Sequence, residues 1–582
     1  MDVFSLRTAA VAAAVAFPIG AQAAPVGDTA VAFELHYLLE GRSASFGRVN
    51  TVDRFVDRFY AMRQGAPAWW TNDGWSAAAS AAIQRIGAAE EHGLRPGDYH
   101  FSRLQQAVLG SASSTEVPKG VAQAELLLTR AVLGYLEDVA NGRIDPSEIG
   151  WEAYRTRRID PPSALQRSLN GGDFAGWFAS VGPVSEQYRL LRKARQRYAQ
   201  IAATEWPVLP EGPTLKPGDR GPRVAVARRQ LHMLEQLRTD PEHLRTVQRQ
   251  TKAAASPVFQ LVSYEGGVGD SAIRSSEGER QGEAELYDSG LEAAVRRFQE
   301  RHGLVADGLI GAGTRAALNI SPRERLREID LNLERLRWLS DNPGDRYVMV
   351  NIPGYELTAY DGGALVDRMK VIVGEPDWET PIMSDYIVDL KFAPDWTIPV
   401  SIVEDETLPK VRRDPGYLGR SNIRVLDRSG GEVSPHSVNW HGASSRSYVF
   451  RQRPGPGNAL GLIRFSLTNN RGIYLHDTPS RKLFDRSMRA LSHGCIRVER
   501  PADLARYLLE QDPTWEGDIE RMMRAPNTSV HHLAQSTPVH LVYLTATIDE
   551  RGELRFFDDV YDRNPRLQEA LDRASSRRRN LG

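Results

Sequence analysis

The spacing of hydrophobic positions divides this chain into a helical first third and a strand-rich last third. In the first third, apolar residues recur at helical spacing over Val52–Phe59 and again over Leu126–Leu136. Glycine and proline interrupt the pattern near residues 93–98 and 141–146. We therefore expect a helical domain over residues 30–205.

The middle of the chain, residues 206–320, has two structured ends around a polar stretch. A turn at 215–224 leads into one predicted helix, and residues 294–319 contain a second helix and a glycine-rich turn. The stretch from about 239 to 285 is rich in Ser, Gly, Gln and Glu, and we interpret it as a flexible insertion. Residues 321–345 then carry an amphipathic pattern that predicts a connecting helix.

From about residue 346 to 582 the period changes to that of strands. Residues 347–352, 369–373 and 539–544 are short β-rich runs. We expect the last of these to form a hairpin with residues 554–557. The predicted fold class is multidomain α+β.

Composition and charge narrow the class of partner. The chain is 41% hydrophobic and 25% charged, as in ordinary globular proteins, and its 73 basic and 74 acidic residues nearly cancel. Nothing in this balance predicts binding to nucleic acid. The basic tail at 573–579 is expected to be a solvated, frayed end.

Residues 1–23 are expected to be a signal peptide. Arg7 precedes a short apolar stretch, and Ala21-Gln22-Ala23 fits a small-x-small cleavage site. The sequence alone leaves cleavage or retention as an anchor open. With cleavage, we expect an exported protein without a stable membrane span.

Cys495 is the single cysteine, and its surroundings favour catalysis over burial as a small apolar residue. It lies in Ser492-His493-Gly494-Cys495, nineteen positions after His476. A thiol in a glycine-containing turn and a histidine at a strand end are what thiolate chemistry requires. We therefore predict a cysteine enzyme with Cys495 as nucleophile and His476 as base.

The base needs a group that orients its other ring nitrogen. Asp477 follows His476, and because adjacent strand residues point to opposite faces, its backbone carbonyl is the expected orienter. Gly494 would let backbone amides face an oxyanion. His493 is a competing base whose simpler interpretation is bracing of the loop.

These residues resemble the signature of the L,D-transpeptidases, a histidine, a spacer, and then [S/T]HGC followed by Asn or Arg. Here it is carried by Tyr474-Leu475-His476-Asp477 and by Ser492 to Arg497, and the run from Gln452 to Gly461 matches the segment before the family's catalytic hairpin. The GDxGxxV and FQxxxGLxxDGxxGxxT runs of residues 206–320 resemble a three-helix peptidoglycan-binding domain. Together they resemble the large periplasmic L,D-transpeptidases of Gram-negative bacteria.

The resemblance implies a mainly-β catalytic domain with an inserted lid, and an acyl transfer in peptidoglycan. Cys495 would attack the carbonyl at the L-centre of meso-diaminopimelate in a tetrapeptide stem and expel D-Ala, with His476 moving the proton. A second stem would then resolve the thioester. The resemblance implies no cofactor and no metal, other periplasmic wall-synthesis proteins as partners, and acylation of the thiol by carbapenems.

The resemblance also implies binding residues. Arg497 would contact a substrate carboxylate, and Tyr474 belongs to the same signature. The expected lid is 401–440. Trp440, Tyr448 and Asn458 are candidates for the donor groove, with core or turn positions as the alternative.

Two other functions stay open at this stage. A zinc peptidase could use His441, His476, His493 and Cys495, although no compact ligand spacing is present. A non-catalytic wall-binding scaffold would depend only on residues 215–319. Hydrolysis or exchange of D-amino acids, in place of transpeptidation, would need only a different acceptor.

Overall fold

The computed structural model describes residues 29–43, 50–110, 117–151, 158–235 and 284–579. The predicted signal peptide and nearly all of the predicted 239–285 insertion lie outside these residues. The described chain divides into two compact units. One contains the described residues up to Gly87 with Tyr99–Tyr135 and Pro161–Ser180, and the other contains the rest. No described helix is long and apolar enough to cross a membrane.

The first unit is helical, as its sequence period predicts. Its elements are α1 (Thr29–Ser43), α2 (Thr51–Met62), the short strands β1 (Trp70–Thr71) and β2 (Gly74–Trp75), α3 (Ala77–Gly87), α4 (Phe101–Gly110), most of α5 (Val117–Asn141), α6 (Pro161–Asn170) and α7 (Phe174–Ser180). Glu125 of α5 is buried and accepts hydrogen bonds from the backbone amides of Trp69 and Trp70 and from the Tyr60 hydroxyl. Burial raises the pKa of Glu125 to about 7.

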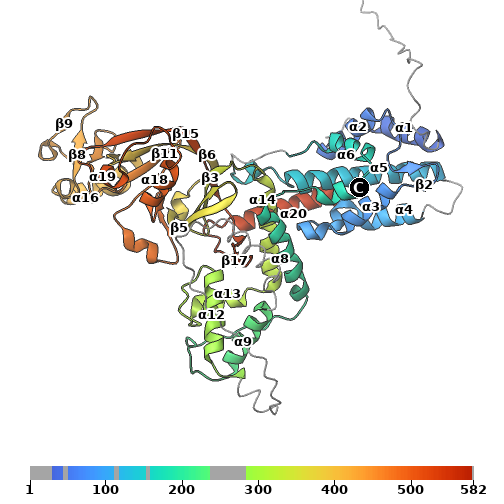
Figure 1. Cartoon of the computed structure of the whole chain (residues 1–582), viewed down its shortest axis with the longest axis horizontal. Helices are drawn as coiled ribbons and strands as arrows, with labels where there is room; N and C mark the ends of the chain where they lie inside the picture. The colour runs from blue at the N-terminus through green and yellow to red at the C-terminus, as the bar shows by residue number, and fades with distance from the viewer. Residues whose placement is uncertain (1–28, 44–49, 111–116, 152–157, 236–283, 580–582) are drawn as a thin grey trace, which may run out of the picture. The chain divides into compact units, whose positions relative to one another are not determined.

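In the second unit, three helices form the module predicted within residues 206–320. They are α9 (Pro222–Glu235), α12 (Ser289–Arg301) and α13 (Ala312–Asn319), packed around Leu231, Val295 and Phe298 (Figure 1). Asp288 caps α12 by accepting from the Leu291 amide at 2.7 Å. The module contacts the catalytic part through His302, whose ring stacks on Phe556.

The connecting helix predicted within 321–345 is confirmed as α14 (Pro322–Trp338). A capping box of Ser321 and Glu324 and a proline at its first turn begin the helix. It packs against α8 (Glu186–Ala202) and α20 (Arg563–Arg579), so α8 belongs to this unit although the sequence placed it in the helical domain of 30–205. The basic tail is thus the end of α20 and not frayed, because Arg578 is ion-paired with Asp138.

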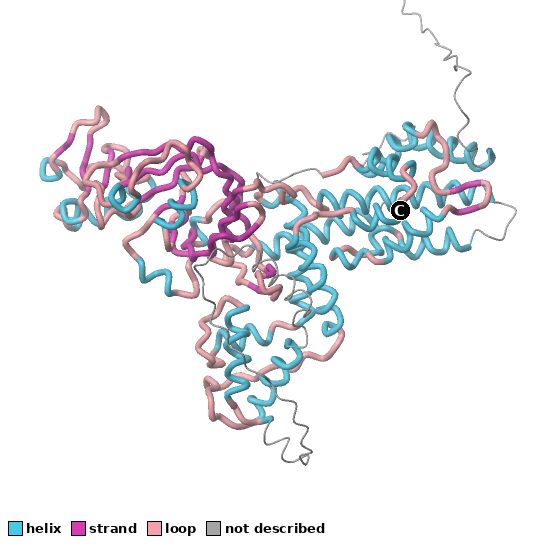
Figure 2. Tube along the Cα trace, viewed as in Figure 1, coloured by secondary structure: helices cyan, strands magenta, loops and turns pink. Residues whose placement is uncertain are grey.

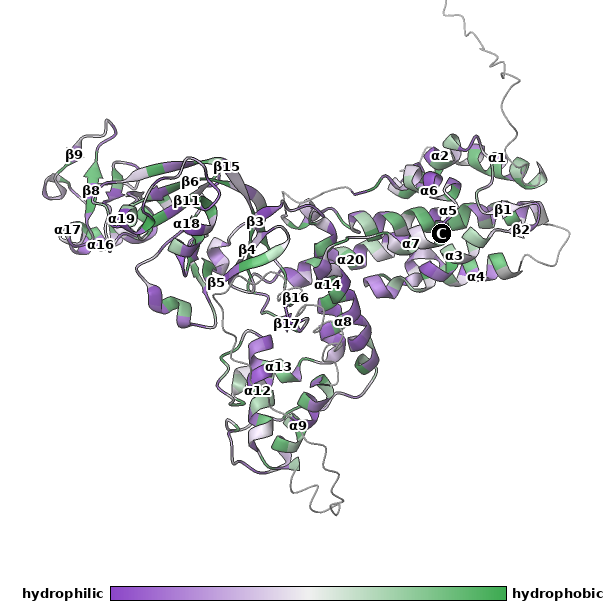
Figure 3. Cartoon of the chain, in the orientation of Figure 1, coloured by the Kyte–Doolittle hydropathy of each residue, from purple (hydrophilic) through white to green (hydrophobic). Residues whose placement is uncertain are grey.

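Both α8 and α14 contain many hydrophilic residues, coloured purple in Figure 3. Many residues of α14 are nevertheless buried. Two of its buried charges, those of Arg337 and Glu334, pair with each other. Arg337 lies 2.6 Å from Glu334, and each side chain is 1% exposed. The Arg337 guanidinium also donates to the Tyr188 hydroxyl of α8 at 3.2 Å, which fixes the two helices together.

The catalytic part is built on a nine-stranded mixed sheet that closes on itself (Figure 2). The strand order is β13-β5-β14-β12-β11-β6-β15-β3-β4, and β4 also pairs with β5. The strands are β3 (Arg346–Asn351), β4 (Glu356–Asp361), β5 (Ala364–Gly374), β6 (Met383–Phe392), β11 (Ile463–Leu467), β12 (Leu475–His476), β13 (Ala490–Ser492), β14 (Ile496–Val498) and β15 (Ser529–Val542). Alternating residues of these strands, such as Val348, Leu390 and Ile496, fill one core.

One sequence expectation in this region is wrong. The predicted hairpin partner of 554–557 was the strand at 539–544, but β15 pairs instead with β3 and β6. The hairpin is formed by β16 (Ala546–Ile548) and β17 (Leu554–Phe556). Before β13 the chain forms a short 3-10 helix, η8 (Arg481–Asp485).

A second, four-stranded sheet belongs to the inserted lid. Its order is β7 (Trp396–Thr397), β10 (Val449–Gln452), β8 (Ile423–Leu426) and β9 (Glu432–Val433). The lid helices are α15 (Val400–Ile402), a π-helical turn at Val403–Thr407, α16 (Leu408–Arg413) and α17 (Tyr417–Arg420). The lid has its own core around Val411, Leu418 and Phe450, so it extends at both ends beyond the predicted 401–440.

The remaining helices and turns complete the second unit. They are η1 (Ala89–His92), η2 (Pro96–Tyr99), η4 (Pro146–Ile149), η5 (Pro376–Trp378), η7 (Pro435–Ser437), α18 (Pro501–Leu509) and α19 (Ile519–Met523). Pro501 lies in the first turn of α18, and Leu504 and Leu508 are buried in the barrel core.

Candidate active site

The loop Ser492–Cys495 joins β13 to β14, and its hydrogen bonds close it tightly. The Ser492 hydroxyl donates to the Cys495 carbonyl at 2.6 Å and accepts from the Gly494 amide at 3.2 Å. Gly494 has φ +100°, a conformation that side chains strain to adopt. Thr380 donates to the Gly494 carbonyl and accepts from the Gly374 amide, both at 2.8 Å. The loop is therefore fixed to the end of β5.

The Cys495 thiol is half-buried beside the parallel strand pair β12 and β14. Its Sγ lies 3.6 Å from the Gly472 carbonyl, and Tyr474 interacts with it through backbone and hydroxyl. Burial raises the pKa of the thiol, whereas the Tyr474 hydrogen bonds and the charges of Arg497 and Arg464 oppose that rise. At neutral pH the resting thiol is therefore mostly protonated, with cations ready to stabilise a thiolate.

His476 ends β12 and is buried. Its Nδ1 lies 2.5 Å from the Asp477 carbonyl, which is the contact expected from the sequence. With the proton on Nδ1, Nε2 is left as an acceptor. Burial, assisted by the charge of Arg497, lowers the pKa of His476 to about 3 despite the Asp477 and Leu460 carbonyls. The ring is thus neutral at physiological pH.

The Asp477 side chain points away from the His476 ring, also as expected. Its carboxylate accepts from the Leu462 amide at 2.9 Å and from Arg481 at 3.0 Å. Gly461, at φ +63°, lies against this carboxylate, where a Cβ would come within 2.4 Å of it. The run before the hairpin is therefore held to the histidine strand by Asp477.

Register places four functional side chains on one face of the barrel. Leu475 pairs with Ile496 and His476 with Arg497. Side chains alternate along a strand, so Tyr474 and His476 share a face, and the Tyr474 ring lies 5.7 Å from the His476 ring in an edge-on contact. No hydrogen bond joins Cys495 to His476 in the described structure. Such pairs are commonly loose before a substrate binds.

His493 faces the lid. Its Nε2 lies 3.2 Å from a carboxylate oxygen of Glu406, and its ring lies 5.3 Å from that of Trp378. Glu406 belongs to the π-helical turn of the lid, and its carboxylate accepts a hydrogen bond from Lys410 at 2.7 Å. Its charge also interacts with Arg497. His493 therefore has a partner in the lid that the sequence did not indicate, and this contact favours the interpretation that His493 braces the loop.

Three residues predicted for the donor groove pack within the lid and the turn that follows it. Trp440 is 5% exposed, donates to the Pro435 carbonyl at 2.9 Å, and packs with Tyr448 in the lid core. Asn458 is buried, and its amide nitrogen donates to the Pro394 and Arg453 carbonyls. These contacts within the lid and its turn agree with the core or turn alternative, and the assignment of the three residues to the donor groove stays a prediction.

The histidines of the zinc alternative do not gather around the thiol. His476 and His493 are engaged by Asp477 and by Glu406, as described above. Across the described ranges, no group of three or more His, Cys, Asp or Glu has the geometry of a metal site.

Comparison with known proteins identifies the three parts of the chain. Residues 345–523 match the family model of the L,D-transpeptidase catalytic domain, residues 278–318 that of a "Putative peptidoglycan binding domain", and residues 54–194 that of a scaffold domain. A curated "Putative L,D-transpeptidase" from Haemophilus influenzae is 35% identical over 246 residues. The match covers 42% of this chain and only half of that relative.

Solved L,D-transpeptidases are more distant. One from Mycobacterium smegmatis is 12% identical over 34% of this chain and 58% of its own, with a TM-score of 0.18. One from Xylanimonas cellulosilytica is 14% identical over 57% of this chain and 99% of its own, also with a TM-score of 0.18. Three parts of the chain, residues 54–194, 278–318 and 345–523, are thus similar to a scaffold domain, a peptidoglycan binding domain and the L,D-transpeptidase catalytic domain.

Proposed function

We propose that this protein is a periplasmic L,D-transpeptidase that cross-links peptidoglycan between meso-diaminopimelate residues through a thioester on Cys495. The observation that carries this proposal is the single thiol of the chain, held by a closed Ser492–Cys495 loop beside a buried neutral histidine. The catalytic-domain match over residues 345–523 supports the reaction class.

In the first half-reaction, the thiol of Cys495 passes its proton to Nε2 of His476, and its sulfur attacks the carbonyl carbon of the third stem residue. The C–N bond to the terminal D-Ala then breaks. The imidazolium returns the proton to the leaving amine, and a thioester remains. Because the pKa of His476 is low, the protonated ring readily gives its proton to the leaving amine.

In the second half-reaction, the side-chain amine of a second diaminopimelate attacks the thioester carbonyl. His476 accepts a proton from the attacking nitrogen and gives it to the departing sulfur, so the free thiol is restored. Arg497 and Arg464 stabilise the sulfur anion in both steps. We also assign to Arg497 the binding of a substrate carboxylate.

The oxyanion of each tetrahedral intermediate needs donors near the thiol. The positive φ of Gly494 turns the backbone at this point of the loop, and we assign the loop amides to this role. Ser492 and Thr380 then act as positioning residues, because their hydroxyls hold the loop and not the substrate.

The test is incubation of the protein with purified disaccharide-tetrapeptide, with Cys495→Ala as the matched variant, followed by mass spectrometry of the products. The proposal predicts a dimer lacking one D-Ala, made by the wild type alone. Tripeptide without dimer would instead indicate a carboxypeptidase. Dimer formation by Cys495→Ala would overturn the role of the thiol.

A further inference from the structure

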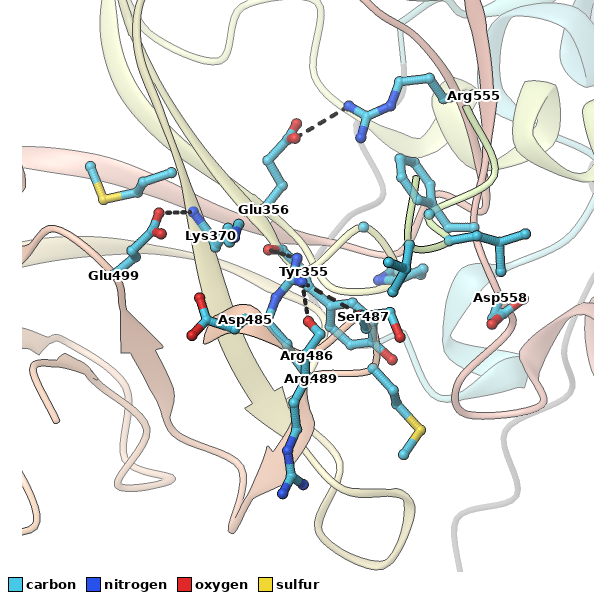
Figure 4. Close-up of a pocket in the computed structure, with 18 of the residues that line it drawn as sticks. Tyr355, Glu356, Lys370, Asp485, Arg486, Ser487, Arg489, Glu499, Arg555 and Asp558 are labelled. Atoms are coloured by element: carbon cyan, nitrogen blue, oxygen red, sulfur yellow. Dashed lines mark hydrogen bonds and ion pairs between the residues drawn. The ribbon is translucent and has the colours of Figure 1, made fainter. Parts of the chain in front are cut away.

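A second cavity, of about 700 Å³, lies where the three-helix module meets the barrel. The barrel side comes from the β3–β4 turn, the middle of β5, the 485–489 segment and the end of β17. Residues 302–305, after α12 of the module, complete it. Figure 4 shows Asp485, Arg486 and Ser487 on one side of the cavity and Glu356 with Arg555 on the other.

This cavity is separate from the thiol but lies along the same strands. Ile496 and Val498 of β14 are buried, so Cys495, Arg497 and Glu499 share the outer face. Glu499 is the cavity residue, and its amide donates to the Lys370 carbonyl. Glu499 follows Cys495 by four positions, which is about 13 Å at the rise of an extended chain.

The floor of the cavity is rigid. Arg489 donates to the Val371 and Tyr355 carbonyls, each at 3.2 Å, and its guanidinium lies 5.2 Å from the Tyr355 ring centre. Tyr355 itself has φ +51°, a conformation rare for a bulky residue. Strained residues of this kind persist where the surroundings fix them and are frequent at binding sites.

The charges around this floor are of both signs, and several are available to a ligand. Glu356 is already paired with Arg368 and Arg555. Among the residues that the structure describes, however, the exposed side chains of Asp485, Arg486 and Asp558 have no hydrogen-bond or ion-pair partner. Lys370 is exposed too, and its ammonium makes one hydrogen bond, to the Phe484 carbonyl at 3.2 Å.

The cavity also offers apolar contact from both domains. Val305 of the module is 60% exposed and Met488 of the barrel is 61% exposed, and both line it. Large apolar side chains exposed at a cavity mouth favour a ligand that covers them.

We propose that this cavity is a second binding site for a zwitterionic peptide, of the class of the peptidoglycan stem, distinct from the site at Cys495. Lys370 and Arg486 bind its carboxylates, and Asp485 and Asp558 bind its ammonium group. The identification of the peptide with a wall stem rests on the proposed function. A wall strand bound here would be held by module and barrel together while the thiol acts on a neighbouring stem.

The experiment uses the single thiol of the chain to separate the two sites. N-ethylmaleimide modifies Cys495 alone, as intact mass verifies, and blocks the site at the thiol. Isothermal titration of the blocked full chain with the diaminopimelate-containing tetrapeptide should still give one binding event. The double variant Lys370→Glu/Arg486→Glu should weaken it at least tenfold, and Val305→Asp should weaken it as well.

Lys482→Glu is the matched control, because Lys482 is exposed on η8 near the cavity but does not line it. Thermal unfolding of each variant verifies that the fold is intact, and Lys370→Met/Arg486→Met replaces the charge reversals if they unfold the chain. The proposal is overturned if the blocked wild type binds no tetrapeptide, or if Lys482→Glu weakens binding as much as the double variant. Failure of the proposed function is separate, since unblocked protein would then release no D-Ala.

Discussion

Glu406 of the lid and His493 of the nucleophile loop are in direct contact, with 3.2 Å between a carboxylate oxygen and Nε2. This pair joins two segments that are 87 positions apart in the sequence, so the lid is attached beside the thiol. Both side chains are partly exposed, and their pairing contributes less than about 1 kcal/mol to stability. We expect the contact to limit access of reagents to the Cys495 thiol, because it holds the lid next to the loop that carries the thiol.

We expect Glu406→Gln to increase the rate at which iodoacetamide labels Cys495 by a few-fold, because the lid loses its charged contact. The measurement is labelling followed by intact mass at pH 7.5. Glu404→Gln is the control, since Glu404 lies in the same turn and contacts Ser445 instead of His493. Equal labelling of the wild type and Glu406→Gln would contradict this role of the pair.

The rate at which Cys495 reacts with iodoacetamide should keep increasing up to an unusually high pH. Burial raises the pKa of this thiol, so a smaller fraction is thiolate at any given pH than for an ordinary cysteine, whose pKa is about 8.5. The labelling rate should therefore still increase above pH 9. Arg497→Gln removes a cation that favours the thiolate and should lower the rate at pH 7.5, whereas Lys482→Gln should not. A profile that levels off below pH 8 would show that the thiol is activated at rest.

Gly494→Ala should reduce turnover more than stability. A Cβ at this position finds its nearest atom 3.4 Å away, so the cost is the positive φ, about 1–2 kcal/mol. If the loop relaxes, the thiol and the loop amides move, and kcat should decrease at least tenfold. Gly430→Ala is the control, with φ +89° in an open turn of the lid. The same loss of kcat in both variants would argue against a role specific to the loop.

Arg337→Met should strongly destabilise the second unit. It leaves Glu334 charged and buried, which costs about 3–5 kcal/mol. The urea midpoint should shift down accordingly. Arg189→Met is the control, because its pair with Glu186 is about half-exposed and contributes under ~1 kcal/mol. An unchanged midpoint for Arg337→Met would mean that Glu334 is satisfied by its other contacts.

The sequence was most informative where chemistry is local. The Cys495 loop, the His476 strand end and the Asp477 carbonyl contact depend on residues close together in the chain, and motif and strand alternation were enough to place them. Two helices of the module within residues 206–320 were likewise predictable from helical period and turn glycines, and the resemblance to a three-helix domain implied the third.

Non-local contacts were not predictable in the same way. Alternation marks residues 539–544 as a strand but does not select its partner, and β15 pairs with β3 and β6 instead of forming the hairpin. The helix α8 has an amphipathic pattern that fits either unit. The resemblance suggested Trp440 and Asn458 for the groove. In the structure both side chains donate hydrogen bonds to backbone carbonyls, which the sequence could not indicate. Glu406 carries no sequence signal at all.

The account as a whole depends on an acyl-enzyme at Cys495, and trapping it is the most direct test. The protein is mixed with disaccharide-tetrapeptide, quenched in acid within seconds, digested and mapped by mass spectrometry. We expect the peptide containing Cys495 to carry the stem without its terminal D-Ala, and no adduct in Cys495→Ala. Cross-linked product formed with the acyl group on another residue, or with none, would contradict the account.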